Sequence, residues 1–174
     1  ADDIFDKFTA TIVNANSTGE DFAFVAGDMA AATNYAGLAM EDMMAVYAAG
    51  TQALNPRRVA FGWQSLTANV VANKKVFEEW GIATDNVKDM IGDLVRLQGE
   101  MSAQEFAELQ KNLVPDRRGM KLLGALIANY DGLERAMLDI DNAAGLTEDA
   151  YETMADTAAS KYAAIGAALE EFTL

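Results

Sequence analysis

The chain has 174 residues, 51% of them apolar, and its 27 acidic and 13 basic residues give a formal net charge of −14. The apolar fraction excludes a disordered chain, the charge argues against nucleic-acid binding, and the length suits one domain with a sizeable core. Because the sequence has no cysteine and no histidine, disulfides, thiolate chemistry, the usual zinc sets and the usual catalytic triads are excluded.

Composition and periodicity predict an all-α protein of about eight helices with short joints that glycine or proline marks. Only two prolines occur, and alanine, methionine, leucine and acidic residues are abundant, which is typical of helical proteins. We expect no signal peptide, and no stretch reaches the roughly 18 apolar residues of a membrane span.

The first two helices are predicted on either side of a polar break near residues 14–20. Apolar side chains share one face of the first helix, at Ile4, Phe5, Phe8, Ile12 and Val13. Ser17 and Glu20 fit a capping box, in which each side chain satisfies a free backbone N–H at the start of the second helix. That helix is expected to end at about Tyr35, before Gly37.

Two further helices are predicted over residues 37–53 and 57–80. Glu41 and Asp42 near the amino end of the first favour its dipole. Asn55 followed by Pro56 is typical of an N-cap and a first-turn proline. The helix that follows is expected to run for about 24 residues to Gly81, with one apolar stripe at Val59, Trp63, Leu66, Val70 and Phe77.

The second half of the chain continues the helical pattern. Residues 85–98 place Val87, Met90, Ile91, Leu94 and Leu97 inward. Ser102 and Glu105 form the best capping box in the sequence, with Met101 set to pack on Phe106. Pro115 ends that helix and Asp116 caps the next, over residues 117–130. A helix over residues 131–145 follows.

Residues 147–172 have the most regular spacing in the chain. Thr147 can cap a helix there, with Glu148 and Asp149 in the first turn. The apolar residues that follow are spaced alternately four and three apart: Tyr151, Ala155, Ala158, Tyr162, Ile165, Leu169 and Phe172. Three heptads are the minimum for a coiled coil, so these seven residues are a candidate interface for self-association or a partner, the alternative being packing on their own domain. We therefore expect a helical bundle over residues 1–145 and a long amphipathic helix over residues 146–174.

Other charged motifs favour structural roles. Asp85, Asp89 and Asp93 are four residues apart, but Lys88 and Arg96 nearby indicate a solvated face rather than a cation site. The stretch "DIDNAAG" over residues 139–145 fails as a calcium loop, because its glycine is one place late, and we interpret it as a helix end with a glycine C-cap.

Two arginine pairs, Arg57–Arg58 and Arg117–Arg118, lie at predicted helix starts. They could hold a phosphate or a partner's carboxylates, but in so acidic a chain internal ion pairs are the expectation. Trp63 and Trp80 are interpreted as core residues.

No catalytic, metal-binding or cofactor-binding residues are predicted. The adjacent acids Glu78–Glu79 and Glu170–Glu171 point about 100° apart on a helix and cannot act as a pair. Acids from separate helices could still cleave a cell-wall polymer, although no spacing requires it, and we expect that the chain is not an enzyme.

The order of these elements resembles the conserved helical region of phage tail tape-measure proteins. The matching phrases run over roughly residues 12–172: a helix, glycine turn and helix over residues 17–66, "KKVFEEWGI" at 74–82, a helix pair over 87–113 and a closing unit over 129–169. Their order and spacing carry the resemblance, since each phrase alone is weak. One departure is "LVPDRRGMK", where the family usually has a phenylalanine–glycine step; only Arg118–Gly119 is retained.

The resemblance implies a structural virion protein in the tail lumen or tail tip. Such proteins set tail length while tube protein polymerises around them, and they leave with the DNA at infection. Expected partners are the tail tube protein, tail tip or baseplate hub proteins, tail assembly chaperones and further copies of the chain, with a trimer favoured. No specific nucleic-acid binding is expected, and membrane contact only during DNA ejection. The alternatives are a stand-alone helical binding module and a membrane-active segment that aids DNA passage.

Overall fold

The structure, a computed structural model, describes residues 2–143 and is all-helical in that range. Nine helices follow one another: α1 (Asp2–Asn14), α2 (Gly19–Tyr35), α3 (Met40–Gly50), α4 (Pro56–Ala72), α5 (Lys74–Glu79), α6 (Val87–Glu100), α7 (Ala103–Leu113), α8 (Arg117–Ala128) and α9 (Tyr130–Asp141). The predicted all-α class is confirmed for these residues. The predicted boundary at residue 145 and the long helix over 146–174 lie outside them.

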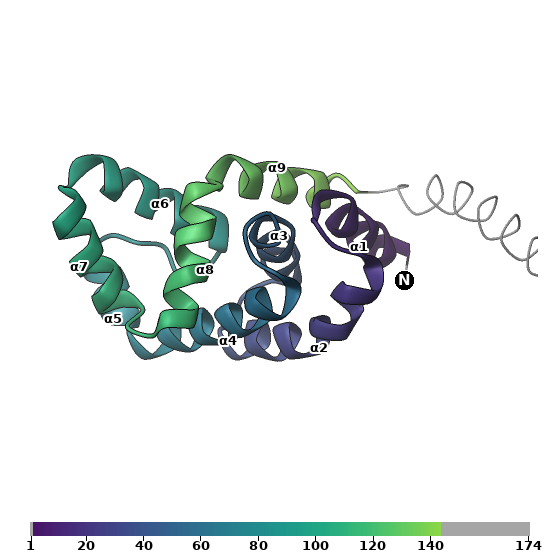
Figure 1. The fold of residues 1–174 in the computed structure, drawn as a ribbon, viewed down its shortest axis with the longest axis horizontal. Helices are drawn as coiled ribbons and strands as arrows, with labels where there is room; N and C mark the ends of the chain where they lie inside the picture. The colour runs from purple at the N-terminus through teal and green to yellow at the C-terminus, as the bar shows by residue number, and fades with distance from the viewer. Residues whose placement is uncertain (1, 144–174) are drawn as a thin grey trace, which may run out of the picture.

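Helix α3 is the centre of the bundle. In Figure 1 it is seen nearly end-on, with α1, α2, α4, α8 and α9 arranged around it, and it packs against each of these helices. Every residue from 42 to 50 is buried. A helix that is apolar all round must be covered on all sides, so the run "MMAVYAAG" dictates the layout of its neighbours.

Helix α4 packs against α2 and α8, and its predicted apolar stripe is confirmed. Val59, Trp63, Leu66 and Val70 are all buried, and so is Phe77 in the next helix. The prediction of one helix to Gly81 was wrong, because Asn73 separates α4 from α5. The Asn73 backbone leaves the helical region (φ −108°, ψ 22°), and its side-chain amide donates a 3.0 Å hydrogen bond to the Leu113 carbonyl at the end of α7.

Most predicted helix starts are confirmed. Ser102 and Glu105 form their capping box at α7, with hydrogen bonds of 2.9 and 3.3 Å. The predicted box at α2 is shifted by one residue: Thr18 and Asp21 form it. The Ser17 hydroxyl instead lies 2.7 Å from the Tyr47 hydroxyl, so Ser17 hydrogen-bonds to α3 and does not cap α2.

Two glycines end their helices with the same backbone arrangement. Gly37 after α2 and Gly81 after α5 have φ values of +68° and +67°. The next residue in each case, Leu38 or Ile82, is buried and returns a backbone hydrogen bond to the helix, to the Thr33 or Phe77 carbonyl. This is the Schellman arrangement, which needs a residue free to adopt positive φ.

The predicted inward face of α1 is only partly correct. Phe8 and Ile12 pack on the core, whereas Ile4, Phe5 and Val13 are exposed. The residues that are buried are Asp6, Ala10 and Thr11. Small side chains at positions 10 and 11 permit close approach to α3 and α9, and that approach decides which face turns inward.

Close packing of α4 on α8 gives a testable prediction at Gly62. A Cβ there would lie 2.7 Å from the Cβ of Leu122 and 3.1 Å from the Arg118 carbonyl oxygen, whereas a Cβ at Gly27 in α2 would meet nothing within 4 Å. We expect Gly62→Ala to lower the free energy of unfolding by about 1–3 kcal/mol through overpacking. Gly27→Ala should raise it by about 0.5–1 kcal/mol through helix propensity. Urea denaturation measures the free energy of unfolding of both variants. Changes of the same sign in the two variants would contradict the close packing at Gly62.

Candidate functional site

The seven residues predicted as a self-association or partner interface lie outside the described residues. They are Tyr151, Ala155, Ala158, Tyr162, Ile165, Leu169 and Phe172. The candidate site that the structure does describe is built by the two arginine pairs.

Both arginine pairs lie in the first turn of a capped helix. Asn55 caps α4 by accepting a 2.9 Å hydrogen bond from the Arg58 backbone N–H. Asp116 caps α8 by accepting one of 2.9 Å from the Gly119 N–H. These are the caps that the sequence predicts. They fix the direction in which Arg57, Arg58, Arg117 and Arg118 leave the backbone.

Asp116 also joins the two helices. Its carboxylate accepts a hydrogen bond from the Ser65 hydroxyl and one of 2.9 Å from the Asn69 amide, both in α4. Burial works to raise the pKa of this carboxyl, but the hydrogen bonds from Gly119, Ser65 and Asn69 outweigh it and lower the pKa below its ordinary value. The charged form of Asp116 therefore holds the start of α8 against α4.

Two of the four arginines, Arg57 and Arg118, stack on aromatic rings. The Arg57 Cζ atom lies 5.0 Å from the Phe24 ring centroid, and the Arg118 Cζ atom lies 5.2 Å from that of Phe61. Within residues 2–143, none of the four arginines has a carboxylate oxygen within 4.0 Å. Within the described residues the expected internal ion pairs of these arginines are therefore not formed, and Arg57 and Arg118 contact aromatic rings instead.

Two adjoining hollows lie along these side chains. One, of about 510 Å³, is lined by residues that include Phe24, Val25, Pro56 and Arg57. The other, of about 490 Å³, is lined by Leu54, Arg58, Phe61, Arg117, Arg118 and Lys121. Arg58 and Phe61 line both. We call this region the basic–aromatic surface and define it as Phe24, Leu54, Arg57, Arg58, Phe61, Arg117, Arg118 and Lys121.

Among residues 2–143, acidic side chains line this surface at one rim. Glu20 and Asp21 line the first hollow. Asp21 is engaged in the capping box of α2, and hydrogen bonds from the Thr18 backbone and hydroxyl lower its pKa. The five cations of the surface are all exposed, so this part of an acidic protein presents positive charge to solvent.

The sequence predicts the arginine pairs but not the aromatic half of the surface. Phe24 is 69% and Phe61 46% exposed. The spacing in the sequence does indicate that Phe61 is exposed. It lies two residues from both Val59 and Trp63, which places it on the side of α4 opposite the buried stripe. Phe24 lies two residues from buried Phe22 in the same way.

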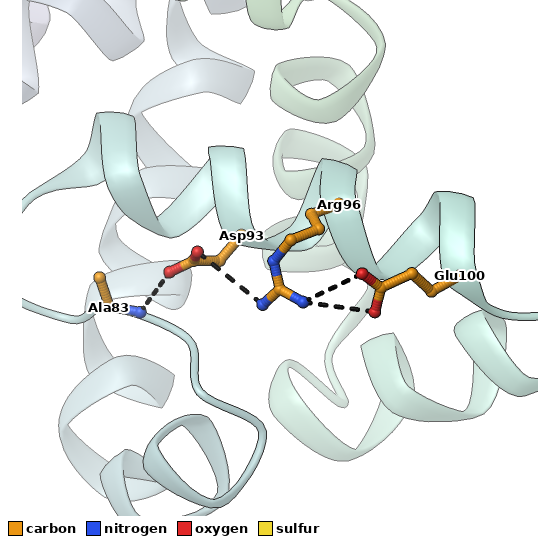
Figure 2. Close-up of polar contacts among 4 residues, drawn as sticks. All are labelled: Ala83, Asp93, Arg96 and Glu100. Atoms are coloured by element: carbon orange, nitrogen blue, oxygen red, sulfur yellow. Dashed lines mark hydrogen bonds and ion pairs between the residues drawn. The ribbon is translucent and has the colours of Figure 1, made fainter.

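Of the three aspartates near α6, Asp85 and Asp89 are exposed, as the predicted solvated face requires, whereas Asp93 is half-buried. Asp89 accepts a 2.9 Å hydrogen bond from the Asn86 amide. Figure 2 shows Asp93 between the Ala83 backbone N–H, at 2.9 Å, and Arg96, at 4.0 Å; Arg96 also contacts Glu100 at 3.3 Å. Within residues 2–143, no group of three or more carboxylates is placed to hold a metal ion.

Two smaller expectations need correction. Trp80 is 45% exposed at the end of α5, not part of the core, because the turn at Gly81 directs the chain away there. Helix α9 ends at Asp141 with Asn142 as its C-cap, so the helix stops before the predicted glycine, and Gly145 lies outside the described residues.

Comparisons with known proteins place no further constraint on the site. No protein family, no curated protein and no solved structure matches the chain. Among the described helices, none combines the length and the apolar character that crossing a bilayer requires.

Proposed function

We propose that the chain is a structural segment of a phage tail tape-measure protein. It would lie in the tail lumen or tail tip, take part in setting tail length during assembly, and leave with the DNA at infection. The observation that carries the proposal is the order of helical phrases over residues 12–172, which resembles this family apart from the departure at residues 113–121.

The helix ends in the region that resembles the family support this proposal. The phrases "AGL" at 36–38 and "WGI" at 80–82 are glycine stops with a buried apolar residue behind them. Such stops break the chain into short helices that pack as a bundle. A continuous helix rises about 1.5 Å per residue and can measure distance, so we assign this segment to a folded part attached to the ruler, not to the ruler itself.

The proposed partners are other proteins of the tail. The basic–aromatic surface has the arginine and aromatic side chains that protein interfaces favour. We propose the tail tube protein, the tail tip or baseplate hub proteins and the tail assembly chaperones as partners. Self-association through residues 151–172, with a trimer favoured, remains part of the proposal. The same surface favours a stand-alone helical binding module as the second candidate.

Mass spectrometry of purified tailed particles tests the proposal. Peptides of this chain should be present in DNA-filled particles and lost from particles that have ejected their DNA in vitro. The tail tube protein, which stays in the tail, is the control and should be found in both. Absence from filled particles would contradict a virion role, and retention after ejection would contradict a place in the lumen.

A further inference from the structure

We propose that the basic–aromatic surface binds the acidic segment 147–172 of this same chain. The inference does not rest on the tail function. It competes with the self-association of residues 151–172 and with the binding of tail proteins to this surface, because each of these contacts needs the same residues. It combines the positive charge of this surface and its two apolar hollows, one between α2 and α4 and one between α4 and α8, with the composition of the segment that follows α9.

The surface presents cations whose hydrogen-bonding edges have no acidic partner in the described part of the chain. The rings of Phe24 and Phe61 cover one side of the Arg57 and Arg118 guanidinium groups. Guanidinium N–H edges form a planar fork that pairs with carboxylates in bidentate geometry. A ligand of this surface must therefore bring several negative charges.

The hollows also require apolar groups from the ligand. Val25, Leu54, Pro56 and the two phenylalanines line them, and a small inorganic anion would leave these walls in water. Two adjoining hollows of about 500 Å³ suit apolar side chains set apart along a peptide. A nucleic acid fits poorly, because a net charge of −14 on the whole chain repels a long polyanion.

Residues 147–172 have both properties. They contain six acidic residues and a single basic one, Lys161, together with the aromatic residues Tyr151, Tyr162 and Phe172. Of the 13 basic residues in the chain, five lie on the basic–aromatic surface. The segment is tethered to the bundle a few residues beyond Ala143, so its effective concentration at the surface is far above that of a free peptide.

Site-specific photo-crosslinking of the full chain tests the proposal. Phe61→p-benzoylphenylalanine places the reactive ketone between the two hollows, and Trp80→p-benzoylphenylalanine places it at the exposed end of α5 as a control. After irradiation and digestion, position 61 should crosslink to peptides from residues 147–172. A mixture of ¹⁴N- and ¹⁵N-labelled chains shows whether the segment comes from the same copy or a second one. Crosslinks within one copy support the proposal, and crosslinks between copies alone would contradict it.

Charge reversal provides the matched comparison. Arg57→Glu with Arg58→Glu should lower the crosslinking yield from position 61 by about fivefold or more, because like charges then face each other. Lys74→Glu with Lys75→Glu makes the same change in net charge at the exposed start of α5 and should leave the yield unchanged. Circular dichroism confirms that both variants are folded. Crosslinks from position 61 that map only outside residues 147–172, or equal losses in the two variants, would overturn the proposal.

Discussion

Trp63→Ala is expected to lower the free energy of unfolding by about 3–5 kcal/mol, the cost of removing a fully buried large aromatic side chain. Trp63 has no exposed surface and lies in α4 among the core residues around α3. Its indole N–H donates a 2.9 Å hydrogen bond to the Thr33 hydroxyl, which in turn donates to the Met29 carbonyl. The substitution therefore opens a cavity and removes the polar link between α4 and α2.

The chain supplies its own control for this prediction. Trp80, the other tryptophan, is 45% exposed, and Trp80→Ala should cost less than about 1 kcal/mol. Since domains of this size have only about 5–15 kcal/mol of stability, Trp63→Phe provides a milder variant that keeps most of the volume. Urea unfolding followed by circular dichroism gives all three values. Equal costs for Trp63→Ala and Trp80→Ala would show that the core is not where the structure places it.

Asp42→Ala should cost about 2–3 kcal/mol, because it leaves the buried Val87 N–H and the partly buried Ala39 N–H without their side-chain acceptor. Asp42 is 3% exposed, near the start of α3. One carboxylate oxygen accepts a 3.0 Å hydrogen bond from the Ala39 N–H, and the other accepts one of 3.0 Å from the Val87 N–H at the start of α6. One side chain thus fixes the beginnings of two helices.

Glu41 next to it is the matched control. Its carboxylate pairs with Lys7 at 2.8 Å in a partly buried position. Glu41→Ala should cost about 1 kcal/mol, because both side chains still contact solvent. Denaturant unfolding at neutral pH distinguishes the two sites. A cost for Glu41→Ala that equals that of Asp42→Ala would contradict the role given to the buried carboxylate.

The pH dependence of stability gives a second test of Asp42. Burial raises the pKa of this carboxyl above its ordinary value, against the opposing effect of the hydrogen bonds from Val87 and Ala39. The folded state therefore holds the proton at pH values where the unfolded state has released it, so stability falls as pH rises above about 4. Asp42→Asn lacks this dependence. The difference in free energy of unfolding between wild type and Asp42→Asn should therefore become smaller from pH 4 to pH 7. A difference that grows over this range would contradict the raised pKa.

Periodicity and caps allowed the core helices to be predicted. The stripe from Val59 to Val70 and the inward residues of α6 were predicted because apolar side chains recur at helical spacing over several turns. Asn55, Ser102 and Asp116 were predicted as caps because each precedes a helical pattern and has a side-chain acceptor at the right distance along the chain. These signals are local, and local signals can be identified in a sequence.

The errors come from contacts between distant segments. Ser17 and Thr18 are both good caps, and the choice falls on Thr18 because Ser17 contacts Tyr47 in the central helix. The break at Asn73 depends on the Leu113 carbonyl, 40 residues away. Within residues 2–143, Arg57 and Arg118 stack on Phe24 and Phe61 where ion pairs were expected. In each case the deciding partner is remote in sequence, and periodicity carries no information about it.

Electron microscopy of tail length is the most direct test of a structural role in the tail. Particles are produced from the source genome with the codons for residues 2–143 deleted in frame, and from the same genome with the single substitution Trp80→Ala as a control. The account predicts that the deletion gives tailless heads or tails of irregular length, while the control gives tails of one length. Tails of normal, uniform length in the deletion particles would contradict it.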